Sequence, residues 1–193
     1  MHSMHLPLST AMIGTGSAGV VAPLQIRSMT VKTLLIVFHS LTGGARQMAE
    51  AAARGAATEA EVRVRLLQAA DAGPGDVLAA DAYIFATPEN LAAVAGMMKD
   101  FFDRTYYAAL DRINGRAYAL LVCAGSDGQN AVRQIERIAT GWRLRRVADS
   151  LVVCTHAQTP AAILAPKRIA AADLARCEEI GATLAAGLAA AVY

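Results

Sequence analysis

The sequence predicts an α/β domain built on a five-stranded parallel sheet, with strand order 2-1-3-4-5 and helices on both faces. From Thr33 onward, short apolar runs alternate with segments of roughly ten to twenty residues whose apolar positions recur every three or four residues. This is the pattern of repeated strand-helix-strand units. The second run instead alternates polar with apolar residues, which indicates an edge strand. With this strand at the edge and right-handed crossovers between the strands, the order becomes 2-1-3-4-5.

Five segments are predicted as strands. Residues 34–38, 82–86 and 119–123 are apolar on both faces, as the central strands of a parallel sheet must be. Residues 61–66 form the alternating edge strand, and residues 151–154 supply the fifth strand before a Pro-containing loop.

Four segments between and after the strands have helical periodicity, and their apolar stripes are predicted to face the core. The crossover through residues 71–80 is rich in Gly and Pro, so we expect at most a turn or two of helix there. The stripes are Met48, Ala52 and Ala56; Val94, Met98, Phe101 and Thr105; Val132, Ile135, Ala139 and Trp142; and Leu174, Cys177, Ile180, Leu184 and Leu188.

Residues 1–30 differ from the domain at 31–193, because they contain no acidic residue and are interrupted by glycines. We interpret them as a flexible tail or an over-long start, with Met29 a candidate true start. The glycines of residues 14–19 match a dinucleotide-binding fingerprint in letters, but no convincing strand precedes them and no acidic residue follows at the required distance. We interpret this match as coincidental.

Composition excludes several classes of function. The net charge is +2 with both signs mixed along the chain, so there is no basic stripe for nucleic acid. No apolar run approaches the ~20 residues that span a bilayer, so no membrane association is expected. The 3 cysteines lack metal-binding spacing, which indicates free thiols, a reducing compartment and a cytoplasmic protein.

The loop after the first strand is the strongest candidate site. Its glycines allow successive N–H groups to point at one spot, the following helix adds its positive end, and two hydroxyls can donate to phosphate oxygens. A tight turn in which the hydroxyls only cap the helix stays an alternative. The predicted phosphate-binding residues are Ser40, Leu41, Thr42, Gly43, Gly44 and Ala45.

Other phosphate chemistries fit this loop poorly. A Walker loop requires a lysine where Arg46 stands. The spacing from Ser40 to Arg46 matches that of a tyrosine-phosphatase loop, but Ser40 takes the place of the nucleophilic cysteine. A phospho-receiver domain requires acidic residues at the strand ends, where this chain has His39 and Thr87.

The motifs together indicate a family. The residues that carry the resemblance are Ser40, Thr42 and Gly43 in the first loop, Thr87 and Pro88 after the third strand, and Lys99, Phe101 and Asp103 in the next helix. From about Lys32 to its end, the chain resembles the flavodoxin-like family, and in the third-strand segment it is similar to NAD(P)H-dependent FMN reductases and related quinone reductases. The resemblance implies a flavodoxin-like three-layer sandwich.

The resemblance also implies a cofactor site. It assigns the turn after the third strand to the isoalloxazine ring of FMN, and a third loop, after the fourth strand, to the same flavin; it assigns no catalytic side chain and no metal. The ring-binding residues would be Thr87, Pro88, Glu89, Asn90 and Leu91, followed by Ala124, Gly125, Ser126, Asp127 and Gly128.

The implied function is a reductase that takes hydride from NAD(P)H and passes two electrons to a quinone or similar small acceptor. No aromatic residue lies in 87–93 to cover the flavin, and the chain is not acidic, which favours a reductase over an electron carrier. Tyr106, Tyr107 or Tyr118 could still supply a ring. A flavodoxin-type electron-transfer protein and a phosphate-binding module without flavin remain alternatives, and the resemblance implies a homodimer or tetramer.

Overall fold

The computed structural model describes residues 31–193; the interpretations of residues 1–30, of the glycine motif and of Met29 lie outside the described residues. The elements are β1 Lys32–Phe38, α1 Gly44–Ala56, β2 Val62–Gln68, α2 Pro74–Ala79, β3 Ala82–Asn90, β4 Ala93–Val94, α3 Gly96–Ala109, β5 Ala117–Ala124, α4 Gln129–Gly141, β6 Arg145–Arg146, β7 Leu151–Cys154, α5 Pro160–Leu164 and α6 Ala171–Ala189.

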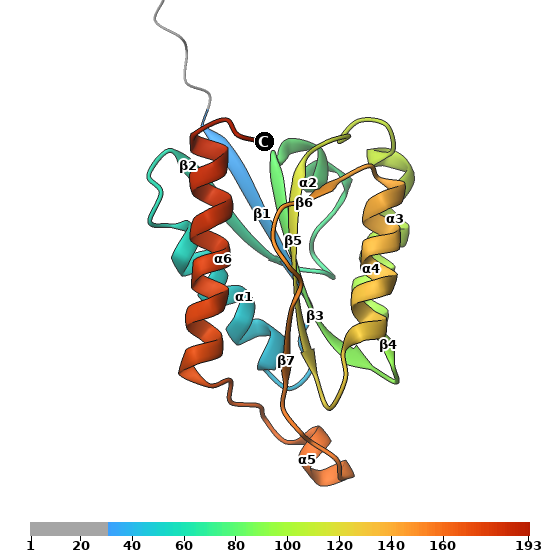
Figure 1. Ribbon diagram of the computed structural model, residues 1–193. Helices are drawn as coiled ribbons and strands as arrows, with labels where there is room; N and C mark the ends of the chain where they lie inside the picture. The colour runs from blue at the N-terminus through green and yellow to red at the C-terminus, as the bar shows by residue number, and fades with distance from the viewer. Residues whose placement is uncertain (1–30) are drawn as a thin grey trace, which may run out of the picture. The chain divides into compact units, whose positions relative to one another are not determined.

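The sheet has the predicted order. Strands run β2-β1-β3-β5, and β5 pairs with β6 and then with β7, so these two short strands share the fifth position (Figure 1). All pairings among these strands are parallel. The alternating strand, β2, lies at the edge, and α2 is the short helix expected in the Gly- and Pro-rich crossover.

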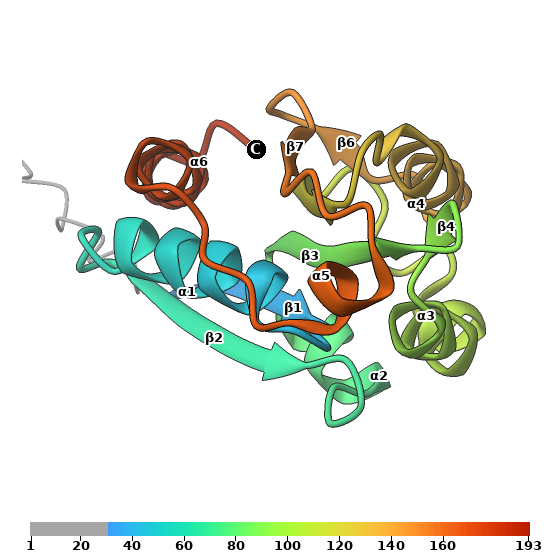
Figure 2. The ribbon, with the colours of Figure 1, turned by 90° about the horizontal axis from the view of Figure 1, so that it is seen from below.

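Helices cover both faces of the sheet, which makes three layers (Figure 2). β1 shows why its sequence is apolar throughout: Leu34 and Ile36 pack in the cluster beneath α1 and α6, while Leu35 and Val37 pack in the cluster beneath α2, α3 and α4. Side chains alternate between the faces of a strand, so both sets are removed from water. No helix within residues 31–193 is long and apolar enough to cross a bilayer.

Three elements differ from the sequence predictions. β3 does not end before Thr87 but continues to Asn90 and turns back through β4 as an antiparallel hairpin. Pro88 is accommodated within the β3–β5 pairing, opposite Cys123, so it does not terminate the strand. Val94 consequently lies in β4 rather than in α3, and the loop after β7 contains the short helix α5, which begins at Pro160.

Candidate functional site at the carboxyl edge of the sheet

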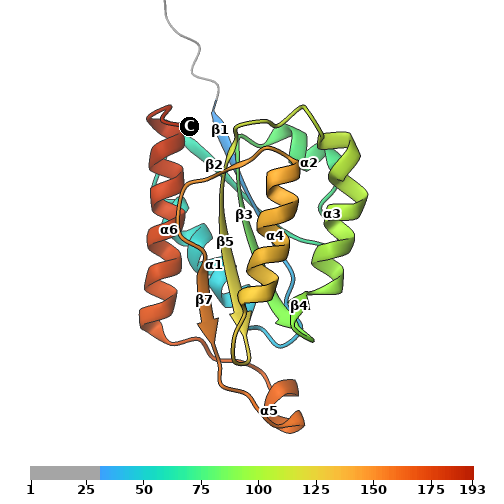
Figure 3. The ribbon, with the colours of Figure 1, turned by 45° about the vertical axis from the view of Figure 1, so that its right-hand side comes forward.

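The predicted loops meet at one edge of the molecule. β1, β3, β5 and β7 all end at the lower edge in Figure 1, and α5 lies beyond their ends in Figures 1 and 3. In a sheet of this type, ligands bind beyond the carboxyl ends of the strands, where the strand order reverses. The structure therefore brings the three loops to the edge where a ligand is expected.

The loop after β1 leads into the amino end of α1. Gly43 adopts a left-handed backbone, with φ of 88°, and its N–H donates to Ser40 Oγ at 3.1 Å. The next three amides, those of Gly44, Ala45 and Arg46, have no acceptor within residues 31–193. The first turn of α1 contains no acidic residue. These unpaired amides are the positive end of a helix dipole.

The amino end of α4 has the same local geometry but is filled. Gly128 is also left-handed, with φ of 77°, yet the carboxylate of Glu89 accepts from Gly128 N at 2.8 Å and from Ala131 N at 3.3 Å. Of these two neighbouring helix ends, α4 is neutralised by a carboxylate of the chain itself. Of the two, α1 is the end whose amides are left for an external anion.

The donor set on α1 suits a phosphate monoester. Three amides of one helix turn have no acceptor within residues 31–193, and the half-buried hydroxyls of Ser40 and Thr42 stand in the preceding loop. Phosphate oxygens accept such hydrogen bonds at a helix amino end without any cationic side chain. Residues 31–193 contain no cluster of three or more His, Cys, Asp or Glu side chains that could hold a metal ion.

The β3–β4 hairpin is the second part of the edge, and it is fixed to α4. Asn130 Nδ2 donates to the carbonyl of Ala92, and Val94 N donates to Gln134 Oε1 at 2.9 Å. The two turn residues, Leu91 and Ala92, both have positive φ, at 51° and 55°, an unusual conformation for residues with side chains. The contacts to α4 hold this strained turn in place.

The hairpin residues predicted to bind the ring have different surroundings. Thr87 is fully buried and donates to the carbonyl of Pro88 at 3.1 Å, and the Glu89 carboxylate is occupied by α4. Asn90 and Leu91 are exposed, Leu91 completely so. The hairpin therefore presents mainly backbone and these two side chains, while Glu89 acts by holding the hairpin to α4.

The third predicted loop lies beside the hairpin. Thr155 N donates to the Ala124 carbonyl at 2.8 Å, which closes the end of the β5–β7 pairing. Ser126 and Asp127 are exposed, whereas Gly128 is buried, and a Cβ there would lie 2.6 Å from Val152 Cγ1. Glycine is thus required at 128 by both backbone conformation and space.

The tyrosines considered as ring partners do not lie in these loops. Tyr118 is buried beneath the helices of one face, and Tyr106 stacks on Trp142 with ring centroids 5.8 Å apart. Tyr107 is exposed near the carboxyl end of α3. Helix α3 begins beside β4 at the edge with the loops, so its carboxyl end, which carries Tyr107, lies away from them (Figure 3).

The chain is similar to known proteins in both sequence and fold. Residues 75–159 match the NADPH-dependent FMN reductase family. The chain is 34% identical over 100 residues to a flavodoxin of Aquifex aeolicus, covering 51% of this chain and 54% of the relative. It is 32% identical over 92 residues to an NAD(P)H dehydrogenase (quinone) of Acidithiobacillus ferrooxidans, covering 37% of this chain and 46% of the relative. The chain thus spans about half the length of the curated relatives it matches.

In fold, the chain is similar to solved structures over most of its length. An archaeal flavodoxin superposes with a TM-score of 0.69 at 19% identity, covering 81% of this chain and 99% of that one. The chain has a flavodoxin-like fold. A flavodoxin, WrbA-like protein from Agrobacterium tumefaciens gives a TM-score of 0.62 at 20% identity, covering 80% of this chain and 96% of that one. The family resemblance and the fold class predicted from sequence are confirmed.

The flavodoxin-like chain also has site residues that the sequence did not indicate. Gln47 Nε2 donates to the carbonyls of Lys167 at 2.7 Å and Gly43 at 3.0 Å, and its Oε1 accepts from Ile169 N at 3.1 Å. Lys167 N donates to the Thr42 carbonyl at 2.7 Å. These contacts hold the segment after α5 against the first loop. Gln47 and Lys167 are 120 positions apart in the sequence, so no local pattern indicates that they meet.

Burial determines the ionisation of two side chains near this edge. Desolvation raises the pKa of the Cys123 thiol to about 11, although the positive charge of Lys167 opposes the shift. Desolvation also lowers the pKa of His39 below its ordinary value of 6.5. Both groups are therefore neutral near pH 7, and neither supplies charge to the loop.

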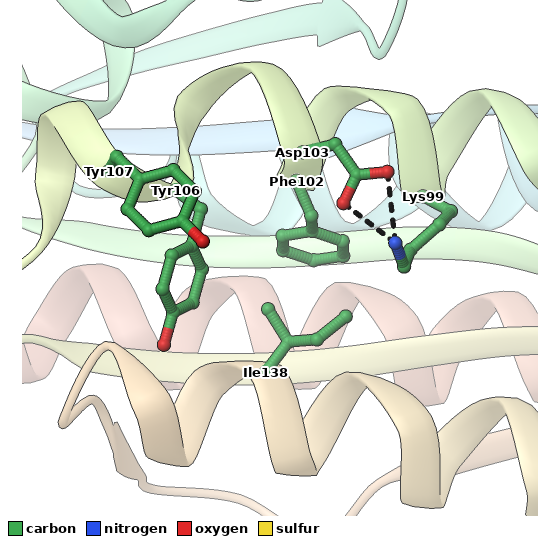
Figure 4. A pocket seen from close by; sticks show the side chains of 6 residues that line it. All are labelled: Lys99, Phe102, Asp103, Tyr106, Tyr107 and Ile138. Carbon is green, nitrogen blue, oxygen red and sulfur yellow. Dashed lines mark hydrogen bonds and ion pairs between the residues drawn. The ribbon is translucent and has the colours of Figure 1, made fainter.

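A separate groove lies between α3 and α4 (Figure 4). It has a volume of about 450 Å³, and Phe102 and Ile138 form its floor, with the Lys99–Asp103 ion pair at one side. Ile138 lies in the last turns of α4, whereas the candidate site adjoins the first turn. The groove is therefore distinct from the loops at the carboxyl edge.

Proposed function

We propose that this flavodoxin-like protein binds FMN, with the phosphate held at the amino end of α1. The observation that carries the proposal is the contrast between two helix ends. Glu89 fills that of α4, whereas the amides of Gly44, Ala45 and Arg46 have no acceptor within residues 31–193. The hydroxyls of Ser40 and Thr42 would complete the donor set. The match to the NADPH-dependent FMN reductase family supports the choice of FMN over other phosphate ligands.

The isoalloxazine ring would lie along the hairpin at 87–91 and the loop at 124–128. The three contacts from hairpin to α4 support this placement, because a ring that must meet a second substrate in one geometry requires a rigid wall. The backbone at Pro88 and the side chain of Asn90 would position the ring edge. Leu91 would contribute apolar contact at the rim.

We further propose that the protein is a reductase. When bound, FMN supplies two-electron transfer from NAD(P)H to a quinone or similar small acceptor. The chain's own residues bind and orient the cofactor, and no side-chain acid or base is assigned. The absence of an aromatic side chain from the described segment 87–93 supports a reductase, because a nicotinamide ring must stack on the flavin face. The 32% identity to an NAD(P)H dehydrogenase (quinone) agrees with it.

The first test is an absorbance spectrum of the protein after incubation with FMN and dialysis. We expect flavin bands to survive in the wild type and to be lost in a Ser40→Ala, Thr42→Ala double variant. Each hydrogen bond to a charged group contributes roughly 1.5–3 kcal/mol, so losing both should weaken binding by at least about a hundredfold. Thr140→Ala, an exposed hydroxyl at the far end of α4, is the matched control and should retain FMN.

A second test separates the reductase from an electron carrier. The FMN-loaded protein should oxidise NADH or NADPH when a quinone is supplied, with ping-pong kinetics. A protein that retains FMN but oxidises neither nucleotide would establish the carrier instead. A wild type that fails to retain FMN would overturn the cofactor assignment itself.

A further inference from the structure

The segment between α5 and α6, residues 165–170, forms a strap across the candidate phosphate loop. In its backbone, Lys167 N donates to the Thr42 carbonyl of the loop at 2.7 Å. The side chain of Gln47 forms hydrogen bonds with the carbonyl of Lys167 and the N–H of Ile169. The stem of Lys167 packs against the first turn of α1: a Cβ on Gly44 would lie 3.4 Å from Lys167 Cβ. Lys167 is thus held at both of its backbone groups: its N–H donates to Thr42 in the loop, and its carbonyl accepts from Gln47 in α1.

The Lys167 ammonium faces only uncharged acceptors in this structure. Nζ donates to the carbonyls of Ala162, Ile163 and Ala165 at 2.7, 2.8 and 2.7 Å, and no carboxylate within residues 31–193 pairs with it. All three carbonyl residues are exposed, and α5 has no buried residue. Because these residues are exposed, water can take the place of the ammonium at their carbonyls.

The amino end of α1 balances only part of the charge of a bound phosphate. A phosphate monoester carries about −1.5 to −2 at pH 7, whereas the amino end of a helix is equivalent to roughly +0.5. The first turn of α1 has one cation, Arg46, and its guanidinium lies over the Phe38 ring, 5.8 Å from the centroid. The Lys167 charge already acts at this edge, since it opposes the effect of burial on the Cys123 pKa.

We propose that Lys167 is a further phosphate-binding residue, which turns its ammonium from the carbonyls of α5 to the phosphate held by the first loop. This inference rests on the proposed function, and it adds a residue from the far end of the chain to the loop at 40–46. The strap keeps the backbone of Lys167 in place, so only the side chain has to change rotamer. When phosphate binds, the carbonyls of Ala162, Ile163 and Ala165 would lose the Lys167 ammonium, while α5 would stay connected to the strap through the chain.

The test compares FMN with riboflavin, which lacks the phosphate, by fluorescence titration at low and high salt. Lys167→Met retains the stem but removes the charge, and Lys167→Arg retains the charge. Arg168→Met, an exposed neighbour on the same strap, is the control for the change in net charge. Melting of each apoprotein checks that the variants fold.

We expect Lys167→Met to weaken FMN binding by about tenfold, to leave riboflavin binding unchanged and to reduce the salt dependence of FMN binding. Lys167→Arg and Arg168→Met should stay within about threefold of the wild type. If Lys167→Met binds FMN as the wild type does, or loses FMN and riboflavin equally, Lys167 has no role toward the phosphate, while the proposed function stands. If the wild type binds no FMN, both proposals fail.

Discussion

Gly44 lies where the proposed phosphate site is packed most tightly against the sheet. It is buried in the first turn of α1, and an added Cβ would stand 2.5 Å from the Cys123 sulfur on β5, closer than two such atoms can approach. Its φ is not in the left-handed region, so the backbone itself accepts alanine. The substitution Gly44→Ala therefore isolates one contact, between helix α1 and the thiol of Cys123.

The size of the effect follows from two opposing contributions. Overpacking a close-packed core costs about 1–3 kcal/mol, whereas replacing glycine by alanine in an allowed conformation stabilises by about 0.4–1 kcal/mol through the unfolded chain. Gly44→Ala should thus reduce the free energy of unfolding by about 1–2 kcal/mol. In a Cys123→Ala background the sulfur is gone, and the nearest remaining atom is Lys167 Cβ at 3.4 Å. There the same substitution should be neutral or stabilising.

The assay is a double-mutant cycle measured by urea unfolding, with thermal melting as a check. We expect a coupling energy of about 2 kcal/mol and a loss of about 2–8 °C in Tm for Gly44→Ala alone. Cys177→Ala, a buried thiol on α6, is the matched control background, in which Gly44→Ala should remain destabilising. An equal effect of Gly44→Ala in the wild type and in Cys123→Ala would refute the packing argument.

Two further predictions concern the hairpin and alkaline pH. Glu89→Ala leaves the amides of Gly128 and Ala131 without their carboxylate and should lower the free energy of unfolding by about 1–2 kcal/mol. The control Glu179→Ala, on the exposed face of α6, should leave it unchanged. Equal urea midpoints for the two variants would contradict the capping role of Glu89. Burial raises the pKa of Cys177 to about 12 from its ordinary 9.0, so the stability it contributes is complete below pH 9 and is lost as pH rises toward 12. Urea unfolding at about pH 8 and about pH 10.5 should therefore show a loss at the higher pH that is smaller in Cys177→Ala, and an unchanged loss would exclude this thiol as a cause.

The sequence by itself determined the strand order and the layers of the fold. Strands β1, β3 and β5 are buried on both faces, and a continuous run of apolar residues predicts such burial directly. β2 alternates because one of its faces is poorly covered, and this placed it at the edge. The first loop was also identifiable, since a helix amino end with two glycines and two hydroxyls depends on neighbouring residues only.

The tertiary structure alone decided how the site is built around that loop. Pro88 stays within β3 because β5 continues beside it, and Glu89 then reaches the amides of α4, which no local pattern indicates. Gln47 and Lys167 meet only because the chain returns across the carboxyl edge after β7. Periodicity and turn chemistry are properties of short segments, whereas a hydrogen bond between residues 120 positions apart exists only once the sheet has brought their segments together.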